Sequence, residues 1–282
     1  MPLLKRLALR FPVIAVASLV TLSAGEFAAP RPFAPGERLT YSITWSVFEA
    51  GEVDATIQQS AATAADRDEI VTTARSHGFV SMLYALNDTF KSRLNPDTMC
   101  SSGISKQVVE GRRRKQTEIV FDASRQMAVL DEHNLAKPGE PPKHGEEPIP
   151  PCVQDVVSAF YFLRSQPMRV GDRIKVPVND GSKTTEVTAE VQAREQIDTP
   201  LGRRYAFRVE PTVFGSLFKR KGRMLIWFSD DERRLPLRIK AMISVGTITG
   251  TLKSASGVAT VGAARESGAV GPITASPRPP RP

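Results

Sequence analysis

The chain has 282 residues, of which 41% are hydrophobic and 24% are charged, and its formal net charge is +8. This length and composition allow one substantial core or at most two small ones, and so exclude an assembly of many domains. Three of the eight net positive charges come from Lys5, Arg6 and Arg10, so the excess over the rest of the chain is modest.

Residues 1–25 have the features of a secretory signal peptide. The basic start is followed by an apolar segment over residues 11–22 and then by the small residues 23–25. The apolar segment is short for a membrane span and is interrupted by Pro12, although a membrane anchor stays open as an alternative. No cysteine follows it directly, so no lipid attachment is expected there. We expect a soluble protein that is exported or secreted, periplasmic in a host with two membranes, and therefore no nucleic-acid partner.

The first half of the domain is predicted to consist of strands. A Pro-rich lead over residues 26–37 cannot join a sheet interior, so the single β-rich domain is expected to span residues 38–254. Residues 39–47 alternate between apolar and polar side chains, which predicts a strand, and residues 49–52 are expected to turn the chain into a second strand. A loop is expected over residues 60–68. A short helix is predicted from the three- and four-residue spacing of Phe79, Met82, Leu83 and Leu86. Further strands are predicted at 69–76, 89–94, 101–110 and 115–122 and near Val129.

A loop and a helix separate the two halves. Residues 135–151 contain six prolines and two glycines without apolar periodicity, which predicts a loop. Residues 152–164 then have apolar side chains on one side, with Asp155 early and Arg164 at the end, as the helix dipole favours. A helix this apolar is expected to pack on a sheet.

The second half is again predicted to be strands. They are expected at 173–178, 184–194 and 203–211, followed by a short apolar connection at 214–218 and a meander of strands at 224–228, 235–243 and up to 252. On the middle strand of the meander, Leu235, Leu237, Ile239 and Ala241 are expected to face the core, and Pro236, Arg238, Lys240 and Met242 the solvent. Residues 255–282 are small and Pro/Gly-rich, which indicates a disordered tail. The fold class is therefore mainly β (α+β), a large curved antiparallel sheet or half-barrel with one principal helix packed on its concave face.

Two cysteines, Cys100 and Cys152, remain after the signal segment. An oxidising compartment favours a disulfide between them, which would stabilise the fold by about 3–4 kcal/mol through loop closure. Two buried free thiols are the alternative, and no histidine stands in a partner motif that would suggest a catalytic cysteine.

Four sequence segments resemble a known family. They are PGERLTYSITWSVFEAGE, FVSMLYALNDTFKSRLNPDT, VQDVVSAFYFLR and IWFSDDERRLPLRIKA, and in this order they resemble the bacterial exported proteins grouped as domain of unknown function 3108, over about residues 33–254. The resemblance implies an antiparallel β-rich exported domain. More remotely, such a domain is similar to the curved half-barrel of periplasmic lipoprotein carriers. It brings no established activity and no catalytic residues.

Catalytic, metal and cofactor motifs are not found in the sequence. His77, His133 and His144 lack metal-ligand spacing, and residues 230–232 fit a turn better than a calcium loop. There is no Gly-x-Ser-x-Gly motif and no glycine-rich phosphate loop. We therefore expect no cofactor, no metal and no enzyme activity.

A concave sheet face with a helix across it favours binding of an apolar ligand. The residues predicted to lie near that face are Trp45, Phe79, Leu83, Tyr84, Phe160, Tyr161 and Trp227, and the alternative for each is an ordinary core position. The expected function is a periplasmic binding or chaperone-like protein for a lipid, lipoprotein or other amphipathic envelope component. The alternatives are an envelope scaffold that recruits a partner by strand addition, and an envelope hydrolase.

The densest basic run consists of Arg112, Arg113, Arg114 and Lys115. It is a candidate contact for an anionic envelope surface, and the alternative is a solvated hairpin tip.

Overall fold

The computed structural model describes residues 31–60, 68–212 and 222–257, and its strands form one antiparallel sheet. The strands are β1 Arg38–Trp45, β2 Phe48–Gln59, β3 Asp68–Ser76, β4 Asn87–Leu94, β5 Ser101–Glu110, β6 Arg113–Asp122, β7 Met127–Asn134, β8 Lys143–Pro148, β9 Arg173–Asn179, β10 Thr184–Thr199, β11 Gly202–Pro211, β12 Arg223–Ser229, β13 Pro236–Ile243 and β14 Gly246–Ser256. The two helices are α1 Gly78–Leu83 and α2 Ser158–Ser165.

The strand order is β8-β7-β6-β5-β4-β3-β2-β1-β14-β13-β12-β11-β10-β9. The chain therefore runs outward from β1 to one edge at β8, crosses to the opposite edge at β9, and returns to β14 beside β1. Arg38 of β1 lies opposite Ser256 of β14, and Trp45 lies opposite Ile248. The sheet curves but does not close into a barrel, because β8 and β9 stay at its two edges.

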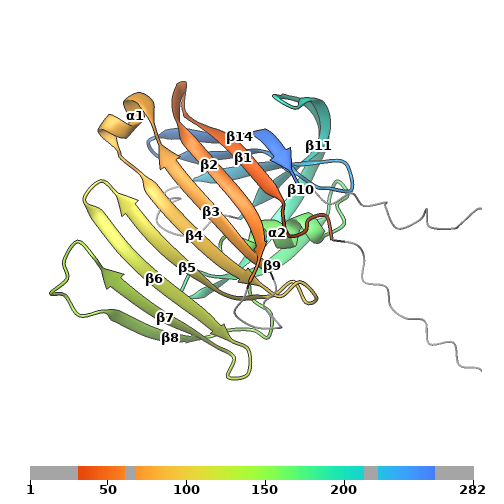
Figure 1. Cartoon of the computed structure of the whole chain (residues 1–282). Coiled ribbons are helices and arrows are strands. Elements are labelled where there is room, and N and C mark those ends of the chain that lie inside the picture. Colours follow the sequence, from red (N-terminus) through yellow and green to blue (C-terminus); the bar gives the residue numbers. More distant parts are fainter. Residues whose placement is uncertain (1–30, 61–67, 213–221, 258–282) are drawn as a thin grey trace, which may run out of the picture.

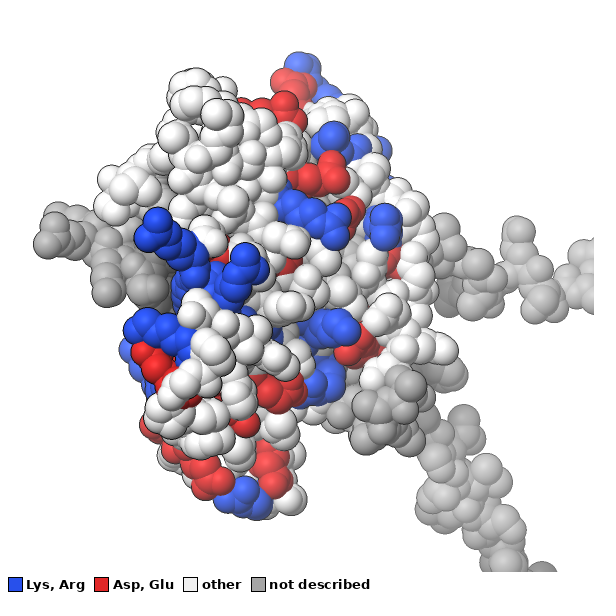
Figure 2. All heavy atoms as spheres, turned by 60° about the vertical axis from the view of Figure 1, so that its left-hand side comes forward, with Lys and Arg blue, Asp and Glu red and all other residues white. Residues whose placement is uncertain are grey.

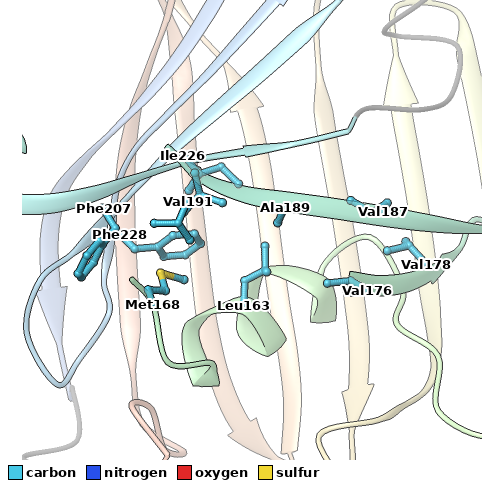
Figure 3. Packing of buried hydrophobic residues seen from close by; sticks show 11 residues of the cluster. Leu163, Met168, Val176, Val178, Val187, Ala189, Val191, Phe207, Ile226 and Phe228 are labelled. Carbon is cyan, nitrogen blue, oxygen red and sulfur yellow. The ribbon is translucent and has the colours of Figure 1, made fainter. Parts of the chain in front are cut away.

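Helix α2 lies in the concave side of the sheet, between the layer of β1–β8 and the strands β9–β11 (Figure 1). Its buried side chain Leu163, together with Met168, packs against the inner faces of β9–β12 (Figure 3). Along β10 the inward positions Val187, Ala189 and Val191 alternate with less buried neighbours, as the two-residue period of a strand requires. Each large apolar side chain buried in this way contributes roughly 1.5–3 kcal/mol to stability. The predicted fold class and the principal helix are confirmed.

The chain between β8 and α2 closes part of the gap between the two halves. Ser101 donates a backbone hydrogen bond to Val153, and Gln154 exchanges backbone hydrogen bonds with the edge strand β9 at Pro177 and Asn179. A disulfide between Cys100 and Cys152, 52 residues apart, fixes the same segment to the start of β5. The predicted disulfide is confirmed.

The Pro-rich lead is part of the core in its described portion. Phe33 is buried and packs edge-to-face on Tyr161, with ring centroids 5.0 Å apart, and Arg31 pairs with Asp68 of β3 at 2.5 Å. The prolines keep the lead out of the sheet, as predicted, but they do not prevent its side chains from packing on the concave side of the sheet.

The predicted loop over residues 135–151 contains a strand, β8, so this prediction was wrong for its second part. Strand β8 is a six-residue edge strand of sequence KHGEEP and is largely exposed. An edge strand needs only one hydrogen-bonded neighbour and buries little side-chain surface, so it does not require the apolar alternation on which the prediction depended.

Three element boundaries also differ from the prediction. The first hairpin turns at Ser46 and Val47, where Ser46 has a positive φ of 56°, so the predicted turn at 49–52 lies inside β2. The principal helix begins at Ser158 rather than at residue 152, because the preceding residues pair with β5 and β9 instead. Strand β14 extends to Ser256, slightly beyond the predicted domain end. The predicted signal segment, most of the loop at 60–68, the connection at 214–218 and the tail from residue 258 lie outside the described residues.

Candidate functional site

A cavity of about 240 Å³ lies between α2 and the sheet. Its wall comes from both halves of the chain and is almost entirely apolar, apart from one polar corner. The lining residues are Tyr41 and Ile43 of β1, Val53 and Ala55 of β2, Thr72 of β3, Val156, Val157, Phe160, Tyr161 and Arg164 in and before α2, Pro236, Ile239 and Ala241 of β13, and Ile248 and Gly250 of β14.

One end of α2 is fixed to the sheet by the buried carboxylate of Asp155. Its Oδ2 accepts hydrogen bonds from the hydroxyls of Ser92 on β4, at 2.6 Å, and Ser101 on β5, at 2.7 Å. Its Oδ1 accepts the backbone N–H groups of Val157 and Ser158, which begin the helix. These four hydrogen bonds satisfy a charge that would otherwise be costly to bury, and they set the position of the helix start.

The other end of α2 is fixed by Arg164. Its Nη1 and Nη2 donate to the carboxylate of Glu37 at 2.6 and 2.9 Å, and neither side chain is accessible to solvent. Nη2 also donates to the carbonyl oxygens of Pro32 and Arg233, so one guanidinium joins the helix to the lead and to the β12–β13 turn. Burial acts to lower the pKa of Arg164, but the hydrogen bonds and charge of Glu37 outweigh it and leave the pKa raised.

The polar corner of the cavity consists of Tyr41, Tyr161 and Arg164. Burial raises the pKa of both tyrosine hydroxyls well above the usual value, so both remain protonated donors. Within the described residues, the buried Tyr161 hydroxyl and Arg164 Nε have no hydrogen-bond partner of good geometry. Buried polar groups without a partner are uncommon in folded proteins, and the two residues that carry them, Tyr161 and Arg164, both line the cavity.

Of the seven residues predicted for the ligand face, Phe160 and Tyr161 line the cavity. Trp45 lies at the end of β1, where its indole Nε1 donates to the carbonyl oxygen of Val245. Trp227 is buried and donates to Glu195, next to Arg238, and does not reach the cavity. Phe79, Leu83 and Tyr84 are exposed on and after α1, at the end of the sheet.

Several lining residues carried a recognisable signal in the sequence. Tyr41 and Ile43 belong to the alternating inward side of the first predicted strand.

The sequence misled or said little at two other lining residues. Pro236 was predicted to face solvent, which was wrong: a bulge between Trp227 and Phe228 changes the pairing, and Pro236 is buried in the cavity wall. Arg164 was interpreted only through the helix dipole, because its partner Glu37 is 127 residues away.

A larger hollow of about 540 Å³ is lined by the start of β9, the middle of β10, the end of β11 and the start of β12. Its charged side chains are already paired, Arg173 with Glu190 and Arg223 with Glu210, so it offers no obvious site for a ligand. Throughout the described ranges, no group of three or more His, Cys, Asp and Glu side chains is arranged to hold a metal ion. Neither described helix has the length and apolarity needed to cross a bilayer.

Comparison with known protein families shows to which family the chain belongs. The model of a family described as a protein of unknown function, DUF3108, matches residues 40–253. The chain belongs to the DUF3108 family. No curated protein is detectably similar to this DUF3108 chain in sequence. The predicted resemblance is confirmed.

Two solved structures are similar to this DUF3108 chain. One is a β-barrel-like protein of domain of unknown function DUF1849 from Brucella abortus, with a TM-score of 0.53 and 7% identity, covering 79% of this chain and 98% of that chain. The other, from Bacteroides fragilis, is described as a candidate exported protein with a YmcC-like fold, with a TM-score of 0.34 and 11% identity, covering 79% and 97%. The first shows that the DUF3108 fold is shared with a second family of unknown function.

Proposed function

We propose that the protein binds an amphiphile with a single apolar chain in the cavity between α2 and the sheet. The observation that carries this proposal is the cavity itself, because a helix lying in a curved sheet would normally fill the hollow completely. Its volume of about 240 Å³ is below the ~300–1,000 Å³ common for drug-sized ligands, which favours one chain over a multi-chain lipid.

The polar corner defines the chemistry of the other end of the ligand. The protonated hydroxyls of Tyr41 and Tyr161 are hydrogen-bond donors, and the charge of Arg164 is already neutralised by Glu37. A neutral acceptor, such as an ester carbonyl or a protonated carboxyl group, would satisfy these donors without adding an unpaired buried charge. The favoured ligand class is therefore an acyl chain that ends in a carbonyl group.

The cavity wall offers a matched pair of variants to test binding. Thr72→Phe adds a ring on the side of β3 that lines the cavity, whereas Thr73→Phe adds the same ring one residue further along, on the opposite face. Native mass spectrometry of the purified protein and calorimetric titration with a neutral decanoate ester, methyl decanoate, are the measurements. We expect bound amphiphile and methyl decanoate affinity to be lost in Thr72→Phe and retained in Thr73→Phe, with both variants folded by circular dichroism.

The polar corner has its own variant. Tyr161→Phe keeps the ring that packs on Phe33 and removes only the hydroxyl. It is expected to weaken methyl decanoate binding about three- to tenfold, the effect of one hydrogen bond. Equal methyl decanoate affinity in wild type and Thr72→Phe would contradict the proposed function.

We also propose that the protein works outside the cytoplasm, in the periplasm of a host with two membranes. The support is the signal-like segment at residues 1–25 and the Cys100–Cys152 disulfide, since such bonds persist in oxidising compartments. Cell fractionation with N-terminal sequencing tests it. An exported protein is expected to lack the first residues, whereas an intact N-terminus in the cytoplasmic fraction would contradict export.

A scaffold that adds a partner strand has less support than ligand binding. One sheet edge, β8, has the charged sequence KHGEEP, ends in a proline and is short, features that discourage strand addition. The other edge, β9, is partly covered by Gln154. Within the described ranges, the serines around Asp155 are buried and serve to fix α2, so they do not support hydrolysis.

A further inference from the structure

Exposed apolar side chains gather at one end of the sheet. Eleven large hydrophobic residues are exposed among the described residues, and seven of them lie at the β1–β2 turn, on and after α1, and at the β13–β14 turn. We call these seven the apolar rim; they are Val47, Phe48, Phe79, Met82, Leu83, Tyr84 and Val245. Val47 and Met82 are the most exposed, at 86% and 82%.

The three parts of the apolar rim form one continuous surface. The rings of Phe48 and Phe79 are in contact, with centroids 6.3 Å apart. Trp45 Nε1 donates to the carbonyl oxygen of Val245 at 3.0 Å, which holds the β13–β14 turn beside the β1–β2 turn. Helix α1 itself has the sequence GFVSML and contains no charged residue.

A basic turn lies directly beside the apolar rim. Gly111, in the β5–β6 turn, donates a backbone hydrogen bond to Ala85 just after α1, at 2.8 Å. The neighbouring Arg112, Arg113 and Arg114 are all exposed. Figure 2, which turns this side of the molecule forward, shows an uncharged surface at the upper left, with Asp and Glu side chains to its right and Lys and Arg side chains gathered below it.

The basic residues of this turn differ in how they are paired. Lys115 pairs with Glu132 at 2.5 Å and Arg113 with Glu110 at 2.9 Å, so both are largely neutralised. In the described part of the chain, Arg112 and Arg114 have no carboxylate partner. Two guanidinium groups without a carboxylate partner therefore lie beside the apolar rim. The exposed carboxylate of Glu49, next to Phe48, lies 3.7 Å from His77 Nε2.

This combination is the one by which proteins bind reversibly to the surface of an anionic bilayer. Apolar and aromatic side chains enter the headgroup boundary while guanidinium groups contact lipid phosphates. A second copy of the chain would bring the same positive charges against these arginines, which opposes self-association through this surface.

We infer that the apolar rim and the adjacent Arg112 and Arg114 form a docking surface for an anionic lipid bilayer. Met82, Leu83, Phe79 and Val47 enter the interfacial layer, and the two arginines bind phosphate groups. The inference does not depend on the cavity having a ligand.

Vesicle flotation of the full chain, purified as the cell produces it, tests this surface. The vesicles are phosphatidylcholine alone or phosphatidylcholine mixed with phosphatidylglycerol. Wild type is expected to float with the mixed vesicles and to be released by added salt, because phosphate contacts are screened. N-terminal sequencing of each preparation shows whether residues 1–25 are present, and only preparations without them are compared.

Two pairs of variants separate specific docking from non-specific adsorption of the protein to vesicles. Met82→Ser with Leu83→Ser is matched by Val120→Ser with Val170→Ser, exposed residues on other parts of the surface. Arg112→Gln with Arg114→Gln is matched by Arg38→Gln with Arg169→Gln, of which Arg38 lies at the far end of β1. Each rim or arginine variant is expected to lower the bound fraction at least about fivefold, and each control to leave it unchanged.

Two results would overturn the inference. The first is equal binding of the rim variant and its control, and the second is a concentration-dependent dimer, seen by analytical ultracentrifugation, that Met82→Ser with Leu83→Ser abolishes. Because Met82 is almost fully exposed, its single substitution should not disturb folding, and Met82→Ser alone repeats the test if the double variant unfolds. Thr72→Phe should bind vesicles like wild type, so loss of the cavity ligand and loss of docking can be told apart.

Discussion

Arg164 at the end of α2 and Glu37 at the end of the lead form an ion pair that no solvent reaches. The rings of Phe33 and Tyr161 lie about the guanidinium, each with its centroid 5.1 Å from Arg164 Cζ. A single residue of the helix is thereby joined to a segment that precedes the first strand.

Removing one partner of this ion pair is predicted to destabilise the fold strongly. Glu37→Ala leaves a buried guanidinium without its counter-charge, which costs roughly 3–5 kcal/mol. Urea denaturation followed by circular dichroism measures the loss. As a control, Asp198→Ala breaks the exposed pair with Arg203 and should leave the urea midpoint almost unchanged.

The double change Glu37→Leu with Arg164→Met should recover most of that stability, because apolar side chains of similar size need no counter-charge. If the double variant were as unstable as Glu37→Ala, the defect would come from packing rather than from the unpaired charge.

The disulfide is predicted to stabilise the fold without being required for it. Cys100→Ser with Cys152→Ser should lower the free energy of unfolding by about 3–4 kcal/mol, the loop-closure value. The segment is also held by the side chain of Gln154, which donates to the carbonyl oxygen of Met99 at 2.7 Å. The variant should therefore still fold at neutral pH, and complete unfolding in the absence of denaturant would contradict this expectation.

Lys106 on β5 is predicted to be a source of instability that depends on pH. Burial lowers its pKa, and the more distant charges of Asp155, Asp180 and Glu132 only partly oppose this effect. Lys106→Met should therefore raise the melting temperature at pH 7 by a few degrees, whereas Lys91→Met, at an exposed position on β4, should not.

The sign of the pH effect follows from the lowered pKa of Lys106. Between that pKa and the ordinary value of 10.5 the unfolded chain binds more protons, so wild type gains stability as the pH rises. The advantage of Lys106→Met should shrink over this window. A constant difference between the two proteins up to pH 11 would contradict the lowered pKa of Lys106.

Asp231 in the β12–β13 turn is predicted to contribute stability that acid removes. Burial acts to raise its pKa, but the hydrogen bond from Ser229, at 2.7 Å, and the charge and hydrogen bonds of Arg233 outweigh it and lower the pKa. The stabilisation is therefore complete above the ordinary value of 3.8 and is lost as the pH falls through the lowered pKa.

Asp231→Asn tests this contribution, because the amide keeps one acceptor oxygen for Ser229 and the Arg233 N–H, and removes the charge and the acceptor that faces the Arg233 guanidinium. It should cost about 1 kcal/mol at pH 7. The denaturation curves of variant and wild type should converge below the lowered pKa, and a difference that persists there would point to altered packing of the turn.

The strands could largely be predicted from the sequence, because one face of most of them is buried and the two-residue period is local information. Positions such as Tyr41 and Ile43 follow directly from that period. Strand β8 could not be predicted, because its pairing with β7 depends on backbone hydrogen bonds and not on its side chains.

The candidate site was only partly predictable, because its polar contacts join segments far apart in the chain. Asp155 binds Ser92 and Ser101, 63 and 54 residues away, and nothing in the local pattern distinguishes it from an exposed helix-start carboxylate. Phe79, Leu83 and Tyr84 were predicted near the ligand face because they are large and apolar, but a short helix at the sheet end has no layer to cover it.

The arrangement of β1 beside β14 has a consequence for how the molecule is assembled. In the described sheet, β1 and β14 are the one pair of neighbouring strands that are not consecutive in the chain. Ser42 and Thr251, which face each other across this seam between β1 and β14, are 209 residues apart. Each half can form its own meander from local contacts, and the hollow exists only after the seam joins them. A circularly permuted chain that starts near β9 and ends at β8 would make that seam a simple hairpin and turn the whole sheet into one uninterrupted meander.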